Sequence, residues 1–449
     1  MKIYEILEAT KGKLLFGNIS DDVRGFTHDS REVNQGDLYV PLIGERVDGH
    51  KFIDSAFEKG ASSIITMQEV NYPDKNVILV EDTLKALADM AIYVRTHHNV
   101  KVVGITGSVG KTSTRDMVAS VVSKQYKTLK TEGNFNSNVG LPLTILRYLD
   151  EEVMVLEMGM NHLKEMEELS LIAKPDIAAI TNVGTAHIGE LGSREKILEA
   201  KMEIIAGMEM NSTLILNRDN DMLQSVTLDD INIIGIGIDQ PCSLQAKNVE
   251  LFENDSCFDL EYQGKSYHVE VPVQGKHFVL NALIAIAIGL ELDIDIELCI
   301  EGVKDFTLTK NRMDVIELKN HITLIDGTYN ASEDSMKSSI DVLANYSRRK
   351  IAVLADMLEL GSYSKELHES VGSYVKDKQI DIFLAVGKEA NYMASAAENK
   401  DTTVIRCEDN QEVISYLLDH LQPNDVILLK GSNGMKLKEV VEILKEKLQ

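Results

Sequence analysis

The chain has 449 residues and carries 71 acidic against 46 basic side chains, a formal net charge of −25. A protein that binds a nucleic acid polymer or an anionic membrane surface needs a basic face, so this balance disfavours both partners. Four scattered cysteines without a CxxC pair predict neither a disulfide framework nor a zinc site. We expect no membrane span, no signal peptide, a cytoplasmic location and a monomer.

The first 82 residues are expected to form a small α/β domain, because short apolar runs alternate with polar, turn-like segments. Three of these runs predict strands, at residues 37–42, 63–66 and 77–80.

Residues 83–311 are expected to form a central domain on a parallel sheet. Strand-like runs alternate there with helical stretches, which is typical of strand–helix–strand units. The expected strands lie at 101–106, 153–157, 177–181 and 213–217, and the expected helices at 83–97, 166–173, 194–207 and 281–291. A more β-like stretch covers residues 231–273.

The same alternation restarts after residue 311 and predicts a smaller, Rossmann-like doubly wound domain over residues 312–449. Its expected strands are 322–326, 351–355, 382–386 and 426–430. The fold class predicted for the whole chain is therefore α/β, in three domains.

A glycine-rich turn between the strand at 101–106 and a helical segment is the strongest local signal. Its glycines let backbone N–H groups converge on phosphates, and the following helix N-terminus favours their negative charge. Lys111 is placed to reach the β- and γ-phosphates, and the Thr112 hydroxyl to bind Mg²⁺. The candidate residues of this loop for binding ATP or GTP are Gly107, Ser108, Gly110, Lys111, Thr112 and Ser113.

This loop departs from the general phosphate-loop pattern, whose first glycine lies where this chain has Ile105. The shorter spacing from Gly107 to Gly110 is a variant. A glycine-rich turn that binds nothing is the alternative interpretation, and the Lys-Thr pair that follows Gly110 disfavours it.

Polar side chains follow two further strands of the predicted central sheet. Glu157 closes the strand at 153–157, and His187 follows the strand at 177–181. The carboxyl ends of parallel strands meet at one edge of a sheet, where ligands bind in open α/β folds. Alone, each side chain would be a solvated carboxylate or a structural histidine. Their grouping beside a phosphate loop favours a role for Glu157 in holding Mg²⁺.

Lys201 lies among charged residues on the helix expected at 194–207, and by its local pattern it is a solvated helix lysine.

Further motifs occur in order along the chain. In the first domain they are Thr27-His-Asp29-Ser30-Arg31 and Gly44-Glu-Arg-Val-Asp48-Gly49-His50. In the central domain they are Gly133-Asn134-Phe-Asn136-Ser-Asn138, Leu156-Glu157-Met-Gly159 and Gly275-Lys-His277. In the last domain they are Arg312-Met, Asp326-Gly-Thr-Tyr329-Asn330 and Lys430-Gly431-Ser432. Together with the phosphate loop, this series resembles the Mur ligase family over the whole chain.

The resemblance implies a ligase whose domains open and close. The first domain would hold the UDP end of a UDP-linked muramyl peptide, the central domain ATP, and the third would close over the nucleotide. The segments around 133–144, 156–162 and 326–336 favour the branch that adds D-Ala-D-Ala to UDP-MurNAc-tripeptide through an acyl phosphate, in peptidoglycan precursor synthesis. The implied cofactors are ATP and two Mg²⁺ ions.

The resemblance also implies roles for individual residues. The expected catalytic residues are Lys111, His187 and Lys201, and the expected metal ligands are Thr112, Glu157, His187 and a carbamate on Lys201. Further nucleotide-binding residues are Asn281, Arg312, Asp326, Tyr329 and Asn330. The residues implied for the UDP substrate are Ser30, Arg31, Asp48, Gly49, His50, Asn134 and Asn136. Carbamylation reverses the local interpretation of Lys201 and requires a neutral amine, which burial near other cations can supply.

The departures from the family pattern gather in the third domain. Gly327 stands in place of a second aspartate, Ser332-Glu333 in place of Asn-Pro, Asn311 in place of a glycine, and Asn433 in place of an arginine. They leave open which amine is added.

Three other functions remain as alternatives. A related ligase of the Mur or folylpolyglutamate type would use the same chemistry with another amine acceptor, but the Ser30-Arg31 and Asp48-Gly49-His50 segments argue against folate. A signalling or mechanochemical NTPase would leave the Asp326–Asn330 segment unexplained. A non-catalytic binding or scaffold protein is disfavoured because Lys111, Glu157 and Lys201 are all present.

Overall fold

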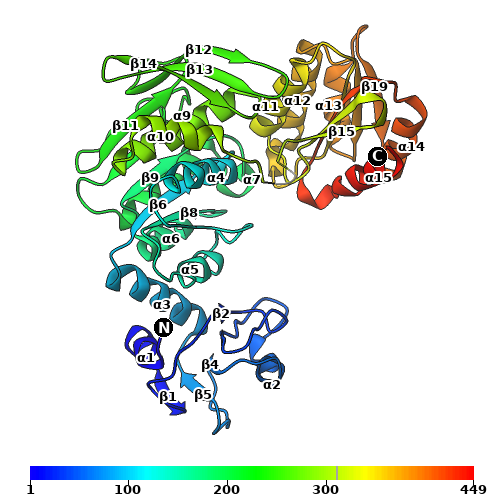
Figure 1. Ribbon diagram of the computed structural model, residues 1–449. Helices are drawn as coiled ribbons and strands as arrows, with labels where there is room; N and C mark the ends of the chain where they lie inside the picture. Colours follow the sequence, from blue (N-terminus) through cyan, green and yellow to red (C-terminus); the bar gives the residue numbers. More distant parts are fainter. Residues whose placement is uncertain (310–311, 449) are drawn as a thin grey trace.

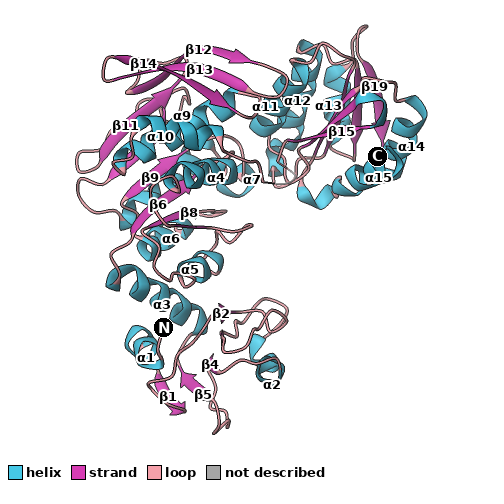
Figure 2. Cartoon of the chain, in the orientation of Figure 1, coloured by secondary structure: helices cyan, strands magenta, loops and turns pink. Residues whose placement is uncertain are grey.

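The computed structural model describes residues 1–309 and 312–448, which form three α/β domains, each built on its own sheet (Figure 1). Helices flank the strands in every domain (Figure 2). The predicted three-domain α/β class is confirmed. The boundaries at residues 82 and 311 stay predictions, and Asn311 lies outside the described residues.

The first domain has a five-stranded sheet in the order β1-β5-β4-β3-β2, with β1 antiparallel to β5 and the other pairs parallel. Its elements are α1 (Ile3–Thr10), β1 (Lys13–Phe16), β2 (Phe26–Thr27), β3 (Leu38–Tyr39), η1 (Gly49–Phe52), α2 (Ile53–Glu58), β4 (Ser63–Thr66) and β5 (Asn76–Leu79). The strand predicted at 37–42 is only Leu38–Tyr39, because Pro41 has no N–H to donate to a sheet.

The central domain has a nine-stranded sheet in the order β14-β13-β12-β11-β10-β9-β6-β8-β7, parallel except for the antiparallel pairs of β13 with its two neighbours. Its strands are β6 (Lys101–Thr106), β7 (Thr128–Lys130), β8 (Val153–Glu157), β9 (Ile177–Ile180), β10 (Thr213–Asn217), β11 (Asn232–Gly237), β12 (Leu244–Leu251), β13 (Ser256–Tyr262) and β14 (Lys265–Val271). Its helices are α3 (Thr83–His97), α4 (Lys111–Val122), α5 (Gly140–Ile145), α6 (Glu165–Ala173), α7 (Ile188–Leu191), α8 (Arg194–Met202), η2 (Glu203–Gly207), α9 (Lys276–Glu291) and α10 (Ile296–Lys304).

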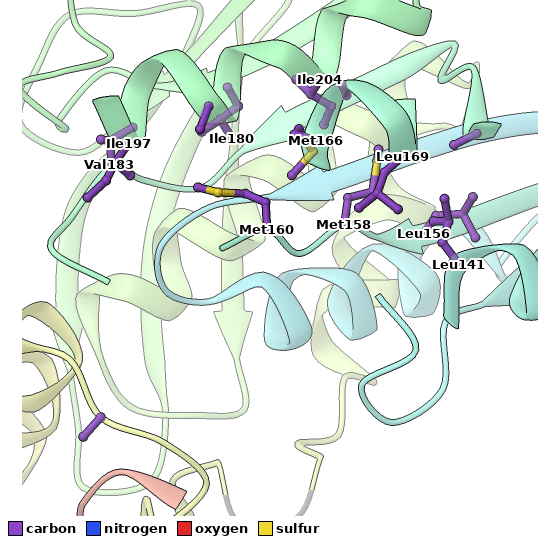
Figure 3. Close-up of a cluster of buried hydrophobic side chains, with 14 of the residues drawn as sticks. Leu141, Leu156, Met158, Met160, Met166, Leu169, Ile180, Val183, Ile197 and Ile204 are labelled. Atoms are coloured by element: carbon purple, nitrogen blue, oxygen red, sulfur yellow. The ribbon is translucent and has the colours of Figure 1, made fainter. Parts of the chain in front are cut away.

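Alternate side chains of the central strands pack into two separate cores, as the pleat of a strand requires. Met154 and Leu156 of β8 join one core, and Val153 and Val155 of the same strand join the other. In the first core, β8 and β9 pack against α5, α6 and α8, which Figure 3 shows from close by. This burial on both faces fixes the ends of β6, β8 and β9 relative to one another.

Two predicted helices of this domain have different bounds in the structure. The helix predicted at 194–207 ends at Met202 and continues as the 3-10 helix η2. The helix predicted at 281–291 begins earlier, at Lys276, directly after Gly275. Gly275 has φ 130°, a conformation that side-chain-bearing residues rarely adopt, so it marks the start of α9.

The third domain has a six-stranded sheet in the order β15-β16-β20-β17-β18-β19, parallel except for β15. Its strands are β15 (Asp314–Leu318), β16 (Ile322–Asp326), β17 (Lys350–Ala355), β18 (Ile382–Val386), β19 (Thr403–Cys407) and β20 (Val426–Lys430). Its helices are η3 (Lys319–His321), α11 (Glu333–Ala344), η4 (Gly361–Tyr363), α12 (Ser364–Asp377), α13 (Ala390–Ala397), α14 (Asn410–His420), η5 (Asn433–Met435) and α15 (Lys438–Leu448). The two strands that were not predicted here, β15 and β19, are half-exposed edge strands, whose apolar pattern is weak.

Among the helices of residues 1–309 and 312–448, none has the length and apolar character needed to cross a membrane.

Candidate active site

A cavity of about 600 Å³ lies between the central and third domains. The central domain contributes the phosphate loop and the ends of β8 and α9, and the third domain contributes the segment after β16 and the end of β20. Predicted site residues that line it are Ser108, Gly110, Lys111, Thr112, Ser113, Asn136, Glu157, His187, Asn281, Arg312, Tyr329 and Asn330. Tertiary folding therefore brings most of the predicted nucleotide site into one space.

The phosphate loop connects the end of β6 to the first residue of α4, Lys111. Gly107 and Gly110 have φ values of 153° and 85°, and a Cβ on Gly107 would overlap the Thr181 hydroxyl. The Lys111 ammonium donates to the Gly107 carbonyl oxygen at 2.9 Å, so it lies back across the loop. The loop thus has the glycine-dependent backbone that a phosphate cradle needs.

Asn182 lies just past the end of β9 and forms hydrogen bonds with the backbone of this loop. Its side-chain oxygen accepts hydrogen bonds from the amides of Ser108, at 3.1 Å, and Val109, at 2.9 Å. The Gly184 amide in turn donates to the Ser108 hydroxyl at 2.9 Å. The segment that leads to His187 is therefore bonded directly to the phosphate loop.

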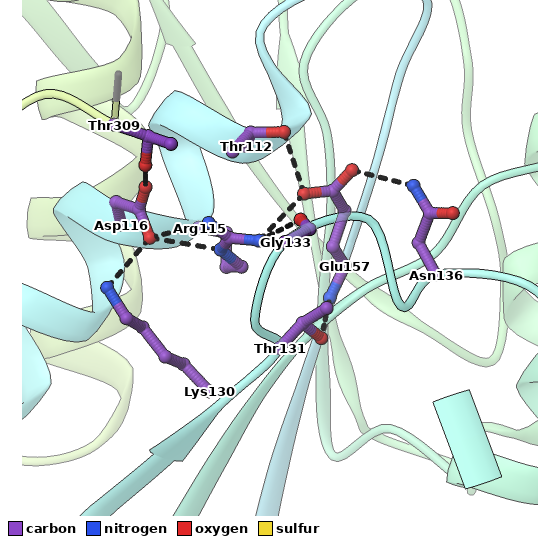
Figure 4. A network of polar contacts seen from close by, with 9 residues as sticks. All are labelled: Thr112, Arg115, Asp116, Lys130, Thr131, Gly133, Asn136, Glu157 and Thr309. Atoms are coloured by element: carbon purple, nitrogen blue, oxygen red, sulfur yellow. Dashed lines mark hydrogen bonds and ion pairs between the residues drawn. The ribbon is translucent and has the colours of Figure 1, made fainter. Parts of the chain in front are cut away.

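Glu157 is the centre of a buried polar network beside the loop (Figure 4). Its Oε2 accepts from the Thr112 hydroxyl at 2.9 Å and from Arg115 Nη1 at 3.2 Å, and its Oε1 accepts from Asn136 Nδ2 at 2.8 Å. Arg115 also donates to Asp116 Oδ1, at 2.8 Å from Nη2. These contacts hold a carboxylate next to the hydroxyl that was predicted to bind Mg²⁺.

The same Asp116 connects the phosphate-loop helix to the segment before the third domain. Its Oδ1 also accepts from Lys130 Nζ at 2.8 Å, and its Oδ2 accepts from the Thr309 hydroxyl (Figure 4). The positive charges of Arg115 and Lys130, together with these hydrogen bonds, outweigh burial and lower the pKa of Asp116. The carboxylate therefore stays ionised inside the protein.

Lys201 is only 2% exposed, which contradicts the local interpretation of a solvated helix lysine. Burial, together with the nearby charge of Lys111, lowers the pKa of Lys201 well below its ordinary value. Burial, then the charges of Lys111 and Lys201, lower the pKa of His187 to about 4, so its imidazole is neutral at pH 7. Three residues distant in sequence thus form one electrostatically coupled group.

The third-domain wall of the cavity is cationic. The Arg312 guanidinium lies 3.7 Å from the centroid of the Tyr329 ring, a stacked cation–π arrangement. Lys430 Nζ donates to the Asn330 carbonyl oxygen at 3.1 Å. Burial, with the charge of Arg312, lowers the pKa of Lys430 to about 8. Such a wall suits an anionic ligand such as a nucleotide.

Asn281 has a buried amide donor, Nδ2, that has no hydrogen-bond partner among residues 1–309 and 312–448. A Cβ on Gly110 would lie 3.5 Å from Asn281 Oδ1, so this amide faces the phosphate loop. A buried donor without a partner is unfavourable unless a ligand completes it. The Asn281 amide is therefore placed to donate a hydrogen bond to a nucleotide bound at the phosphate loop.

Some predicted residues do not line the cavity. Asp326 is buried, and its Oδ1 accepts a hydrogen bond from the Thr328 hydroxyl at 2.6 Å. Gly107, Lys201 and Asn134 are also not among the residues that line the cavity. The five first-domain residues lie apart from the cavity; they are Ser30, Arg31, Asp48, Gly49 and His50.

The first-domain residues instead organise their own loops. Asp48 Oδ1 lies 2.7 Å from His50 Nδ1, and His50 Nε2 accepts from the Met67 amide at 3.1 Å. A Cβ on Gly49 would meet the backbone of Leu42 at 2.8 Å. Asp48, Gly49 and His50 therefore each have a structural role in forming this turn.

Arg31 pairs with Asp29 at 2.6 Å, and its side chain is 84% exposed. Its guanidinium is therefore open to a ligand approaching from solvent.

Several residues at the site were missed by sequence reasoning. Arg115 and Asp116 follow the phosphate loop directly, but a charged pair on a helix normally reads as a solvated face. Asp334 and Glu359 reach the loop before α7 from the third domain, through Thr185 and His187. Only the packing of the third domain on the central domain brings Asp334 and Glu359 to this loop, so no local signal could have found these two residues.

No cluster of three or more histidine, cysteine or acidic side chains at metal-binding separation occurs in residues 1–309 and 312–448. The oxygens available for a cation come from Thr112 and Glu157, with His187 adding a neutral imidazole nitrogen. Hydroxyl and carboxylate oxygens suit Mg²⁺, which keeps several waters and also binds phosphates. The donor set fits a Mg²⁺ that a nucleotide brings with it.

Three family models match the chain in order. They describe the Mur ligase family catalytic domain over residues 22–95, the Mur ligase middle domain over 105–289, and the Mur ligase glutamate ligase domain over 311–433.

Individual relatives match along nearly the whole chain. The UDP-N-acetylmuramoyl-tripeptide–D-alanyl-D-alanine ligase of Bacillus subtilis (strain 168) is 37% identical, over 99% of this chain and 98% of the relative. The crystal structure of MurF from Acinetobacter baumannii superposes with a TM-score of 0.90 at 29% identity, over 99% of this chain and 98% of that one. The MurF ligase of Thermotoga maritima in complex with ADP superposes with a TM-score of 0.85 at 30% identity, over 95% of this chain and 98% of that one. The chain belongs to the Mur ligase family.

Proposed function

We propose that this protein is an ATP-dependent ligase that joins D-Ala-D-Ala to UDP-MurNAc-tripeptide through an acyl phosphate, in peptidoglycan precursor synthesis. One observation carries the proposal: the phosphate loop, the Glu157 carboxylate and the Asn281 amide, unpaired among the described residues, all line the same interdomain cavity. Full-length relatives named for this reaction support the choice of substrates.

ATP is held by the central domain and covered by the third. The amides of residues 107–112 surround the phosphates at the N-terminus of α4. Lys111 leaves the Gly107 carbonyl and turns to the β- and γ-phosphates. Asn281 supplies its free amide, and the stacked Arg312 and Tyr329 contact the nucleotide from the third-domain side.

Mg²⁺ neutralises phosphate charge when it is bound. Thr112 and Glu157 would hold it beside the loop, and Asn136 and Arg115 orient the glutamate oxygens. A second Mg²⁺ is assigned to His187 and a carbamate on Lys201, because the lowered pKa of Lys201 favours the neutral amine, which can add CO₂, lose a proton and become an anionic carbamate. An anion there also relieves the repulsion between Lys201 and Lys111.

The reaction has two steps. A carboxylate oxygen of the tripeptide attacks the γ-phosphorus and ADP leaves, which gives an acyl phosphate. The dipeptide amine then attacks the acyl carbon, loses a proton, and phosphate leaves as the amide forms. Lys111 stabilises the transferring phosphoryl group, and docking of the third domain excludes the water that would hydrolyse the acyl phosphate.

The UDP end of the muramyl peptide is assigned to the first domain. Arg31 offers an exposed guanidinium for the diphosphate, with Ser30 next to it. Asp48, Gly49 and His50 act by shaping the adjoining turn.

Asn134 and Asn136 belong to the central-domain segment that leads toward the cavity. Asn136 lies on its wall and bonds to Glu157, so a substrate in contact with Asn136 would reach the metal site.

The incoming amine is assigned to the part of the cavity wall where Gly327, Ser332 and Asn433 depart from the family pattern. Glu333 turns away and bonds to Lys337 at 2.7 Å within its own domain.

The decisive experiment measures ADP release from Mg²⁺-ATP and UDP-MurNAc-tripeptide, with and without D-Ala-D-Ala, and follows the mass of the UDP product. Dipeptide-dependent turnover with the mass increase of one amide-linked D-Ala-D-Ala is expected. Turnover only with another amine would replace the acceptor in this proposal with that amine. No turnover with any amine would reject the ligase assignment.

A further inference from the structure

Asp334 lies in the first turn of α11 in the third domain, and its carboxylate reaches the central domain. Its Oδ2 accepts from the Thr185 amide at 3.0 Å and from the Thr185 hydroxyl at 3.4 Å. The N-cap of α11 is Ser332, so Asp334 is not required as the cap of its own helix. The side chain therefore serves the contact between domains.

The segment that Asp334 contacts, residues 182–187, is the one that supports the phosphate loop. Three residues before Thr185, Asn182 accepts from the amides of Ser108 and Val109. One residue before it, the Gly184 amide donates to the Ser108 hydroxyl. Two residues after it lies His187, which has a left-handed backbone conformation with φ 64°. A displacement of Thr185 would thus reach both the phosphate loop and His187.

The charge of Asp334 also matches its surroundings. Arg194, at the start of α8, donates to the Val183 carbonyl oxygen at 2.8 Å and pairs with Asp221 at 2.6 Å. The hydrogen bond to Asp221 is the main cause of the raised pKa of Arg194, and the negative charge of Asp334 adds to it. An anionic acceptor at position 334 is consequently favoured beside this segment.

We propose that Asp334 is a positioning residue, a carboxylate that couples docking of the third domain to the geometry of the phosphate loop through Thr185. The proposal rests on the ATP-dependent ligase function given above. It predicts that the contact acts on ATP and leaves binding of the UDP substrate, which involves the first domain, unaffected. Asp334 itself is not among the residues that line the cavity.

Gly184 provides an independent test of the same contact. A Cβ at this position would overlap the Asp334 carboxylate, although the Gly184 backbone itself lies outside the left-handed region. Gly184→Ala is therefore expected to hinder docking by a steric clash and not by backbone strain. Because the clash needs the carboxylate, Gly184→Ala with Asp334→Ala should be no worse than Asp334→Ala alone.

The experiment compares Asp334→Ala, Asp334→Asn and the control Glu333→Gln in the full chain. Glu333 precedes Asp334 on α11, but its carboxylate bonds to Lys337 and Ser370 inside the third domain. We expect Asp334→Ala to raise KM for ATP about tenfold, the effect of losing one hydrogen bond to a charged acceptor, with KM for UDP-MurNAc-tripeptide unchanged. Asp334→Asn keeps an acceptor oxygen and should recover most of the loss, and the control should match wild type.

Small-angle X-ray scattering reports the docking directly, and a thermal melt checks the fold. Asp334→Ala and Gly184→Ala should increase the radius of gyration, while Glu333→Gln should not. Wild-type KM for ATP and an unchanged radius of gyration in Asp334→Ala would overturn the proposal. If the wild-type protein showed no ligase turnover, the proposed function would fail instead. The radii of gyration of the variants, together with their affinities for a fluorescent ATP analogue, would still decide the role of Asp334.

Discussion

The Thr112 hydroxyl donates a 2.9 Å hydrogen bond to Glu157 Oε2, and this contact joins the first turn of α4 to the last residue of β8. A phosphate-loop hydroxyl and a strand-end carboxylate thereby share one position beside the cavity. Arg115 and Asn136 donate further hydrogen bonds to the same carboxylate and fix its orientation. The arrangement is preorganised to take up a cation when a nucleotide binds.

Glu157→Gln should lower the rate of ADP formation about 100-fold or more, because a neutral amide oxygen binds Mg²⁺ weakly while keeping the shape of the site. A Mg²⁺ titration of the rate should shift to higher concentrations. The far-UV circular dichroism spectrum should match wild type. A wild-type Mg²⁺ dependence would remove Glu157 from the metal site.

Lys201 should carry a carbamate, because burial lowers the pKa of its amine and leaves it able to react with CO₂. With ¹³C-bicarbonate, an NMR carbamate signal should appear in the wild type and be absent in Lys201→Ala. The control Lys196→Ala, on the same helix but exposed and paired with Glu199 at 2.6 Å, should retain the signal and the activity. An identical spectrum for wild type and Lys201→Ala would contradict the assignment.

Asn281→Ala should separate binding from stability. The free energy of unfolding should change by less than about 1 kcal/mol, because Nδ2 has no partner to lose in the part of the chain that the structure describes. KM for ATP should rise about tenfold, since the nucleotide loses the donor. Urea unfolding and steady-state kinetics measure the two quantities. A large loss of stability with unchanged KM would show that Asn281 has a structural role only.

Arg115→Met should destabilise the protein by about 3–5 kcal/mol, because it leaves the buried carboxylates of Asp116 and Glu157 without their shared cation. Arg115→Lys keeps the charge but not the planar fork and should lose less. Urea unfolding followed by circular dichroism gives both values. Equal stability of Arg115→Met and wild type would mean that Lys130 alone balances Asp116.

His277 should make stability fall in acid. Burial, together with the charge of Lys430, lowers its pKa from 6.5 to about 4 in the folded protein. Between these values the unfolded chain binds a proton that the folded protein does not. The free energy of unfolding is therefore unaffected by His277 above pH 6.5 and decreases as the pH falls toward 4. At pH 5 the loss should reach about 2 kcal/mol relative to pH 8.

His277→Gln removes this titration, so its free energy of unfolding should decrease less between pH 8 and pH 5 than that of wild type. Urea unfolding at both pH values measures the difference. Parallel losses in the two proteins would assign the acid sensitivity to other groups.

Local sequence was sufficient where local physics decides the structure. An apolar strand, two glycines with positive φ and a helix-initiating Lys-Thr pair specify the phosphate loop within a dozen residues, and the helix predicted at 83–97 is α3 with the same bounds. Glu157 was placed correctly because it ends a strand whose apolar run marks its limits. Resemblance to a family then supplied the roles that no short pattern contains.

The tertiary structure decided the environments of charged side chains. Lys201 looks solvated in its own helix, yet packing of that helix leaves the lysine 2% exposed beside Lys111. Thr185 and Asp334 are far apart in sequence, and docking of two domains brings them to 3.0 Å. Helical periodicity and strand patterns report which face of an element is apolar, whereas pKa values and interdomain contacts depend on which other element covers that face.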